Sequence, residues 1–118
     1  MPFDRGDIVE VSFLIPHNNK IEPHPAVIIS SSEVYDTDGC YICVMLTTQT
    51  RIDRFSFEIT NEMLVKQSNK PFSQARCHLV TYITEAHIIK NAHSNKMKEN
   101  AVDRLVDRIA ATALSPNY

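Results

Sequence analysis

The stretch HPAVIISSSEVYDTDGCYICVMLTTQ, residues 24–49, contains two short apolar runs, Pro25–Ile29 and Tyr41–Leu46. Each run is short, contains β-branched residues and lies between turn-forming residues, which predicts two buried strands. The segment between them is polar and includes Asp38 and Gly39, so we expect it to form a loop. These two strands form the centre of the predicted fold.

Polar side chains flank the two strands. His24 precedes the first strand, and Thr47, Thr48 and Gln49 follow the second. If the strands are antiparallel neighbours, His24 and Thr47 lie at the same end of the sheet. Because an imidazole can both accept and donate a proton near neutral pH, this end of the sheet is the first candidate functional site.

Periodic patterns predict further elements on both sides of this centre. Alternation of apolar and polar residues indicates strands over Asp7–Leu14, Phe55–Ile59 and Ala75–Thr81, and a short strand around Ile88–Ile89. A loop is expected over Ile15–Pro23, which is rich in proline and asparagine. Helical spacing predicts a helix over about residues 98–114, with an apolar stripe of Val102, Leu105, Val106, Ile109, Ala110 and Ala113.

The fold class that follows is mainly β (α+β), in a single domain over residues 1–118. Roughly five to seven short strands with polar turns suggest a small, strongly curved antiparallel sheet. The predicted C-terminal helix packs its apolar stripe on the open mouth of that sheet.

A second candidate site lies on the predicted strand Ala75–Thr81. A period of two directs Ala75, Cys77 and Leu79 inward, and Arg76 and His78 outward. The planar guanidinium of Arg76 suits a phosphate group. The alternative is that both are solvent-facing residues of an edge strand.

The composition restricts the classes of function. A formal net charge of −2 argues against a protein that coats nucleic acid with bulk positive charge, although a local basic patch remains open, formed by Arg51, Arg54, Lys66, Lys70 and Arg76. Two glycines leave no glycine-rich phosphate loop. The apolar runs are too short to span a membrane, and the first residues do not resemble a signal peptide, so we expect a cytoplasmic protein.

The three cysteines, Cys40, Cys43 and Cys77, are an odd number, so we expect no disulfide framework. Cys40 and Cys43 are three apart on or beside a strand and point to opposite faces, as do the neighbours Cys77 and His78. We therefore expect small core residues, no metal site and no cofactor.

Three motifs together resemble the MazF/PemK family of toxins from bacterial toxin–antitoxin pairs. They are Arg5-Gly6-Asp7-Ile8-Val9, Pro25-Ala26-Val27-Ile28-Ile29-Ser30 and Cys43-Val44-Met45-Leu46-Thr47-Thr48-Gln49. The resemblance covers nearly the whole chain. One departure stands out: the family has an arginine before the proline, where this chain has His24.

The resemblance implies an SH3-like barrel, a homodimer, and a growth-inhibiting toxin held in check by a cognate antitoxin protein. The implied activity is that of a metal-independent, sequence-selective endoribonuclease on single-stranded RNA, chiefly messenger RNA. RNA supplies its own nucleophile, the 2′-hydroxyl, so such an enzyme needs groups that move protons and stabilise the phosphate.

The resemblance also assigns residues by position. The implied catalytic residues are His24 and Thr47, with Arg76 and His78 on the strand that faces the RNA. The candidate RNA contacts after the central strand are Thr48, Gln49 and Arg51. In the family the loop that corresponds to Ile15–Pro23 lies over the RNA, but its sequence differs here, so the family's contacts do not carry over. His17 and Lys20 are the candidate contacts in this loop, and the alternative for His17 is a solvated side chain. An acidic antitoxin tail is expected to contact Arg51, Lys70 and Arg76.

A different class of function remains open because the family arginine is absent. CcdB-type relatives share the fold and act by binding DNA gyrase without cutting RNA. The alternative is therefore a non-catalytic toxin or regulator that binds gyrase or nucleic acid, or an inactivated family member.

Overall fold

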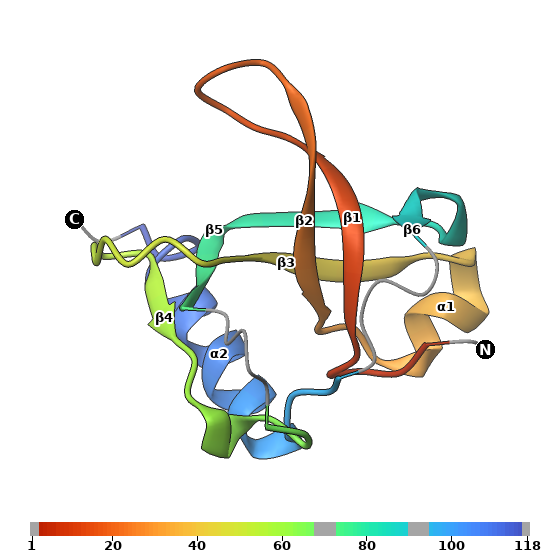
Figure 1. Ribbon diagram of the computed structural model, residues 1–118. Helices are drawn as coiled ribbons and strands as arrows, with labels where there is room; N and C mark the ends of the chain where they lie inside the picture. Colours follow the sequence, from red (N-terminus) through yellow and green to blue (C-terminus); the bar gives the residue numbers. More distant parts are fainter. Residues whose placement is uncertain (1–2, 68–72, 90–94, 117–118) are drawn as a thin grey trace.

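The computed structural model describes residues 3–67, 73–89 and 95–116 of the chain. Within them the chain forms a six-stranded sheet, two α-helices and two short 3-10 helices (Figure 1). In chain order the elements are β1 (Ile8–Leu14), β2 (Ile21–Ile28), α1 (Ser32–Asp38), β3 (Tyr41–Thr47), β4 (Ser56–Glu58), η1 (Asn61–Met63), β5 (Gln74–Ile83), η2 (Glu85–His87), β6 (Ile88–Ile89) and α2 (Glu99–Ala111).

The sheet is antiparallel throughout, with the order β4-β5-β3-β2-β1-β6. The expected mainly β class with a C-terminal helix is confirmed. The expected closed barrel is not: among the described residues no ladder joins β4 to β6, so the sheet has two edges. These edge strands have three residues and two residues, which leaves few backbone groups to pair across the gap. The β1–β2 hairpin crosses β3 and β5 steeply, so the open sheet is strongly curved (Figure 1).

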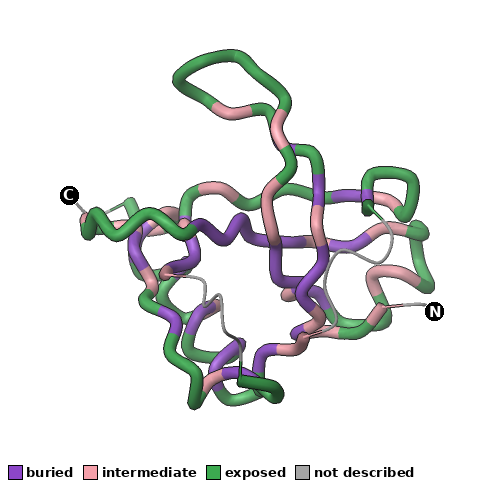
Figure 2. Tube along the Cα trace, in the orientation of Figure 1, coloured by how far each residue is buried: buried purple, intermediate pink, exposed green. Residues whose placement is uncertain are grey.

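The central strand β3 is buried on both of its faces (Figure 2). Val44 and Leu46 pack into one apolar cluster with α2, and Tyr41, Cys43 and Met45 pack into a second cluster with β1 and β2. An uninterrupted apolar run is the expected sequence for a strand covered on both sides. The prediction of a buried strand at Tyr41–Leu46 is therefore confirmed.

The helix α2 covers the first of these clusters. Its buried residues Ala101, Val102, Leu105 and Ile109 repeat at helical spacing. The predicted stripe is correct at Val102, Leu105 and Ile109, but Ala110 is exposed and Ala113 lies beyond the end of α2. Ala101, which the prediction left out, is buried. In the described part of the chain no helix is long and apolar enough to cross a membrane.

The expected loop between the two central strands contains a helix, α1. Gly39 follows that helix in the left-handed conformation (φ 67°), and its N–H donates to the carbonyl of Tyr35 at 2.7 Å. Tyr35 also stacks on Tyr41 with ring centroids 5.1 Å apart. The prediction of a loop was wrong because Asp38 and Gly39, taken as turn residues, end a short helix.

The strand β2 is longer than expected and begins at Ile21, inside the segment predicted to be a loop. Residues 21–28 pair with β1, but only Ala26–Ile28 pair with β3. Pro23 and Pro25 therefore lie on a part of β2 that has a β-partner on one side only, where a missing N–H leaves no ladder bond unmade. Residues 8–28 thus form a hairpin arm whose tip projects from the body (Figure 1).

The cysteines are free, and Cys43 and Cys77 are buried in different apolar clusters. Burial raises the pKa of the Cys43 thiol to about 12 and also raises that of Cys77. Both behave as small core residues, as the sequence predicted.

We predict that Gly6→Ala destabilises the fold by at least about 2 kcal/mol. Gly6 has φ +97°, and a Cβ there would lie 2.6 Å from the carbonyl oxygen of Met97, whose N–H donates to the Gly6 carbonyl at 2.8 Å. The strained φ and the displaced backbone therefore act together. Urea denaturation of the variant and the wild type measures the loss.

Gly39→Ala is the matched control. Gly39 also has a positive φ, of +67°, but no heavy atom lies within 4 Å of the position a Cβ would take. We expect this variant to lose only about 1 kcal/mol. Equal losses for the two variants would show that the contact with Met97 has no energetic role.

Candidate functional site

A groove of about 390 Å³ opens between the β1–β2 arm and the ends of β3 and β5. It collects most of the residues that the sequence singled out, although they come from five separate segments. The predicted site residues that line it are His17, His24, Thr47, Gln49, Arg51, Arg76 and His78.

His24 and Thr47 lie at the same end of the sheet, as predicted. β2 and β3 are antiparallel, their ladder ends at the pair Ala26–Met45, and His24 and Thr47 both line the groove beyond it. The Nε2 of His24 lies 3.7 Å from a carboxylate oxygen of Glu22. Thr47 is buried, and its hydroxyl accepts the N–H of Gln49 at 3.2 Å. The groove therefore contains an imidazole with a carboxylate neighbour and a hydroxyl held by a backbone N–H.

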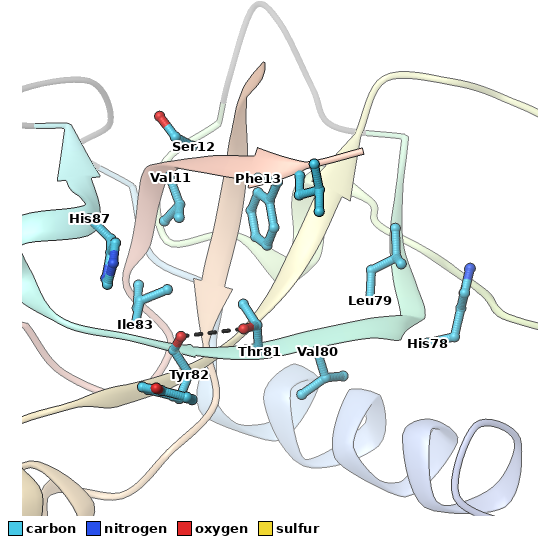
Figure 3. A pocket seen from close by; sticks show the side chains of 11 residues that line it. Val11, Ser12, Phe13, His78, Leu79, Val80, Thr81, Tyr82, Ile83 and His87 are labelled. Carbon is cyan, nitrogen blue, oxygen red and sulfur yellow. Dashed lines mark hydrogen bonds between the residues drawn. The ribbon is translucent and has the colours of Figure 1, made fainter. Parts of the chain in front are cut away.

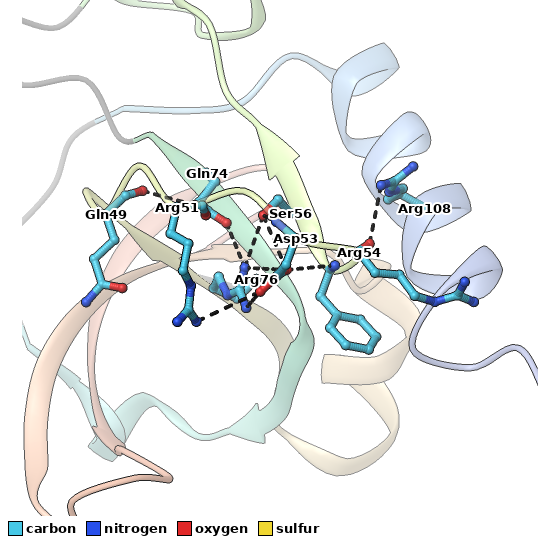
Figure 4. Close-up of polar contacts among 9 residues, drawn as sticks. Gln49, Arg51, Asp53, Arg54, Ser56, Gln74, Arg76 and Arg108 are labelled. Carbon is cyan, nitrogen blue, oxygen red and sulfur yellow. Dashed lines mark hydrogen bonds and ion pairs between the residues drawn. The ribbon is translucent and has the colours of Figure 1, made fainter. Parts of the chain in front are cut away.

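Arg76 is not the solvent-facing cation that the sequence suggested. Its side chain is 11% exposed, and its guanidinium forms a two-pronged ion pair with Asp53 at 2.8 and 2.9 Å (Figure 4). Nη1 also donates to the hydroxyl of Ser56 at 3.1 Å and to the amide oxygen of Gln74 at 2.9 Å. Arg76 is enclosed because β4 pairs with β5 at this point and places Ser56 opposite it.

Gln74 connects this ion pair to the loop after β3. The amide is 1% exposed, and its nitrogen donates to the carbonyls of Gln49 at 3.0 Å and Arg51 at 2.7 Å. One buried side chain thus fixes both Arg76 and the segment that carries two groove residues. Gln74 and Asp53 were not predicted as site residues from the sequence. A single glutamine before a strand and a single aspartate in a charged turn form no recognisable pattern.

Charges and desolvation in the groove shift the pKa values of two side chains, Asp53 and His78. The bond from Arg76, together with the Phe55 N–H and the Arg51 charge, holds the pKa of Asp53 well below its ordinary range, despite the opposing effect of desolvation. Desolvation first, and then the nearby Arg76 cation, lower the pKa of His78 below its ordinary value of 6.5, while Asp53 acts in the opposite direction. The His78 ring also packs on Phe55, with ring centroids 4.7 Å apart. His78 is therefore neutral at pH 7 and able to accept a proton.

A second cleft, of about 350 Å³, lies between β1 and β5 and shares His78 and Leu79 with the groove. Phe13 from β1 and Ile83 from β5 point into it, whereas Tyr82 points to the other side of β5 (Figure 3). The groove therefore continues into a second cleft, and apolar as well as polar side chains line both.

Three sequence-predicted residues are not placed in the groove. Lys20 closes the loop of the arm: its carbonyl accepts the Ile15 N–H, and its N–H donates to the side-chain oxygen of Asn18. It does not line the groove. Thr48 does not line it either; its carbonyl accepts the hydroxyl of Ser73. Lys70 lies outside the described residues. Within the described part of the chain, no group of three or more His, Cys, Asp or Glu residues could hold a metal ion.

We predict that Gln74→Met lowers the free energy of unfolding by about 2–4 kcal/mol. Methionine fills a similar volume, but it leaves the carbonyls of Gln49 and Arg51 and one Arg76 N–H without this partner, at about 1–3 kcal/mol for each group that stays unsatisfied. Urea denaturation measures the change. Gln49→Met, at an exposed position on the same loop, is the control and should cost less than about 0.5 kcal/mol. Similar stabilities for the two variants would contradict a central role for Gln74.

Solved structures of similar fold share little sequence with this chain. A MazE–MazF complex from Deinococcus radiodurans has a TM-score of 0.66 at 9% identity, with 94% of this chain and 95% of that chain covered. An endoribonuclease in complex with its cognate antitoxin, from a mycobacterial species, has a TM-score of 0.66 at 12% identity, with 98% and 97% covered. At this identity the likeness shows the fold alone.

Comparison with curated proteins gave no match. The family assignment comes from a family model, described as the PemK-like, MazF-like toxin of type II toxin-antitoxin system, which matches residues 4–112. That match spans all the elements of the sheet and all the groove residues named above. The chain therefore belongs to the PemK-like, MazF-like family of toxins of type II toxin–antitoxin systems.

Proposed function

We propose that this chain, as a single domain, is a toxin that cuts single-stranded RNA, chiefly messenger RNA, at selected sequences and without a metal ion. The observation that carries the proposal is the groove, in which two imidazoles, a buried threonine and an arginine come together. The mycobacterial protein of similar fold is described as an endoribonuclease, which supports the same reaction class.

The first chemical step removes the proton of the ribose 2′-hydroxyl, whose oxygen then attacks the adjacent phosphorus. His78 is the base for this step, because partial desolvation and the nearby Arg76 lower the pKa of its exposed imidazole. As the new bond to phosphorus forms, the bond to the 5′-oxygen breaks. The products are a 2′,3′-cyclic phosphate and a 5′-hydroxyl end.

His24 is the acid that protonates the leaving 5′-oxygen. A carboxylate oxygen of Glu22 lies 3.7 Å from the Nε2 of His24, and both residues line the groove. Thr47 supports the crowded phosphate with its hydroxyl. His24 thus takes the place of the family arginine with a side chain that exchanges protons.

Arg51 is the cation that contacts the phosphate backbone. Its side chain is 76% exposed, and its ion pair with Asp53 is long, at 3.9 Å, whereas Arg76 is enclosed. His17 and Gln49, from the arm and the loop after β3, contact neighbouring nucleotides. Arg76 keeps a part in the site through its effect on His78.

The proposed partners are a second copy of this chain and an antitoxin protein. One structure of similar fold is described as an endoribonuclease in complex with its cognate antitoxin, and another as MazE–MazF. A disordered acidic tail that lies along the groove would meet Arg51 and exclude RNA, which is how a disordered segment covers a long surface. The proposed homodimer, in the cytoplasm, joins two such grooves into one extended surface.

We predict that the purified protein cleaves a long single-stranded RNA in the presence of EDTA and leaves 5′-hydroxyl ends. Phosphorylation of the fragments by polynucleotide kinase without prior phosphatase treatment detects those ends. The control is the same RNA with a 2′-deoxy substitution at the mapped cleavage site, which removes the nucleophile. Intact RNA at a large excess of protein would instead favour a non-catalytic toxin of the CcdB type.

We also predict an acidic inflection in the dependence of kcat/KM on pH. Activity rises as His78 loses its proton, with the inflection below pH 6.5 because the pKa of His78 is lowered. His24→Ala and His78→Ala should each lose roughly two to four orders of magnitude. His24→Arg restores the family residue and should retain more activity than His24→Ala. Activity of both alanine variants equal to wild type would exclude the two-histidine mechanism.

A further inference from the structure

Asp53 lies in the loop between β3 and β4, and hydrogen bonds within that loop hold the residue in place. One oxygen accepts the N–H of Phe55 at 2.9 Å, and the Asp53 N–H donates to the hydroxyl of Ser56 at 3.0 Å. Such local bonds are the usual means by which an aspartate orders a turn. The negative charge is therefore in place before any ligand arrives.

The same carboxylate determines the charge beside His78. It forms the two-pronged pair with Arg76, which precedes His78 by two residues and so lies on the same face of β5 (Figure 4). A guanidinium without a counter-ion at this place would repel a proton on the imidazole. Asp53 acts in the opposite direction and compensates part of that repulsion.

Phe55 adds a second link between Asp53 and His78. Its N–H donates to the Asp53 carboxylate, and its ring packs on the His78 ring at 4.7 Å between centroids. The turn that fixes the carboxylate thus also supports one face of the imidazole.

We propose that Asp53 is a positioning residue for His78: it holds Arg76 as a compensated ion pair and thereby sets the readiness of His78 to take a proton. The role as a base rests on the proposed nuclease function, but the effect on the charge of His78 does not. Asp53 need not touch the RNA. It acts through Arg76 and Phe55.

Other charged or titratable groups line the groove and the cleft to which His78 belongs. They are His17 on the arm, Glu22 and His24 on β2, Arg51 on the loop after β3, Tyr82 on β5 and His87 in η2. Among them, His17 acts in the same direction as Arg76 on His78. Asp53 differs from these groups because its carboxylate bonds directly to Arg76, the cation nearest to His78 in the sequence.

The test is an NMR titration of the histidine ring protons in wild type and in Asp53→Asn, with the His78 signal assigned by its loss in His78→Gln. Asparagine keeps an oxygen for the Phe55 N–H but removes the charge. We expect the titration midpoint of His78 to move to lower pH by roughly 0.5–1 unit. Asp36→Asn, which removes an exposed carboxylate from α1, is the matched control and should leave the midpoint unchanged.

A double variant, Asp53→Asn with Arg76→Gln, separates charge from folding. It removes both charges, so the His78 midpoint should return toward or above the wild-type value. If Asp53→Asn does not fold, Arg76→Gln and the double variant carry the test, because they differ only in the charge at residue 53. The His78 midpoint should then be higher in Arg76→Gln than in the double variant. Equal midpoints in wild type and Asp53→Asn, or in this second pair where Asp53→Asn does not fold, would overturn the proposal.

Kinetics distinguish failure of this inference from failure of the nuclease function. If the protein cuts RNA, the acidic inflection of kcat/KM in Asp53→Asn should move to lower pH together with the NMR midpoint, and the plateau value of kcat should fall because the base is weaker. A shifted midpoint in a protein that cuts no RNA would leave the charge effect intact and reject the proposed reaction. An unshifted midpoint in an active nuclease would reject the role of Asp53 alone.

Discussion

The burial of β3 on both faces is the constraint from which the rest of the arrangement follows. Side chains alternate along a strand, so Val44 and Leu46 need a cover on one side, and Tyr41, Cys43 and Met45 need one on the other. The helix α2 supplies the first cover, and the curved β1–β2 hairpin supplies the second. This explains why a short sheet is bent so strongly.

The groove lies where that burial stops. Beyond Leu46 the chain turns polar, and the groove residues Thr47, Gln49 and Arg51 follow at once. Most of the polar bonds there join this segment to β5, through Gln74 and the Asp53–Arg76 pair. The pair is electrically neutral as a unit, so the site can be rigid without the strong positive charge that a chain of net charge −2 does not provide.

The sequence predicted the features that depend on local periodicity. The alternation along β1, the apolar run of β3 and the inward positions of Ala75 and Cys77 were all correct, because each reflects burial of one or both faces of a strand. The placement of His24 and Thr47 at the same end of the sheet followed from the antiparallel pairing of β2 and β3. The predictions that failed concern features that depend on tertiary context. The short helix α1 relies on Tyr35 stacking on Tyr41, and the extension of β2 relies on β1 as a partner. The enclosure of Arg76 by Asp53 required two segments distant in sequence to meet.

The prolines of β2 have a consequence for how the arm meets other molecules. An exposed strand edge offers a row of N–H groups on which a foreign strand can add and start aggregation. In Ile21–Pro25 the side turned away from β1 lacks the N–H groups of Pro23 and Pro25, so this edge cannot serve as a template for strand addition. The arm can therefore project into solvent without promoting aggregation by strand addition. A molecule that binds the arm along this edge must therefore contact its side chains instead of pairing with its backbone.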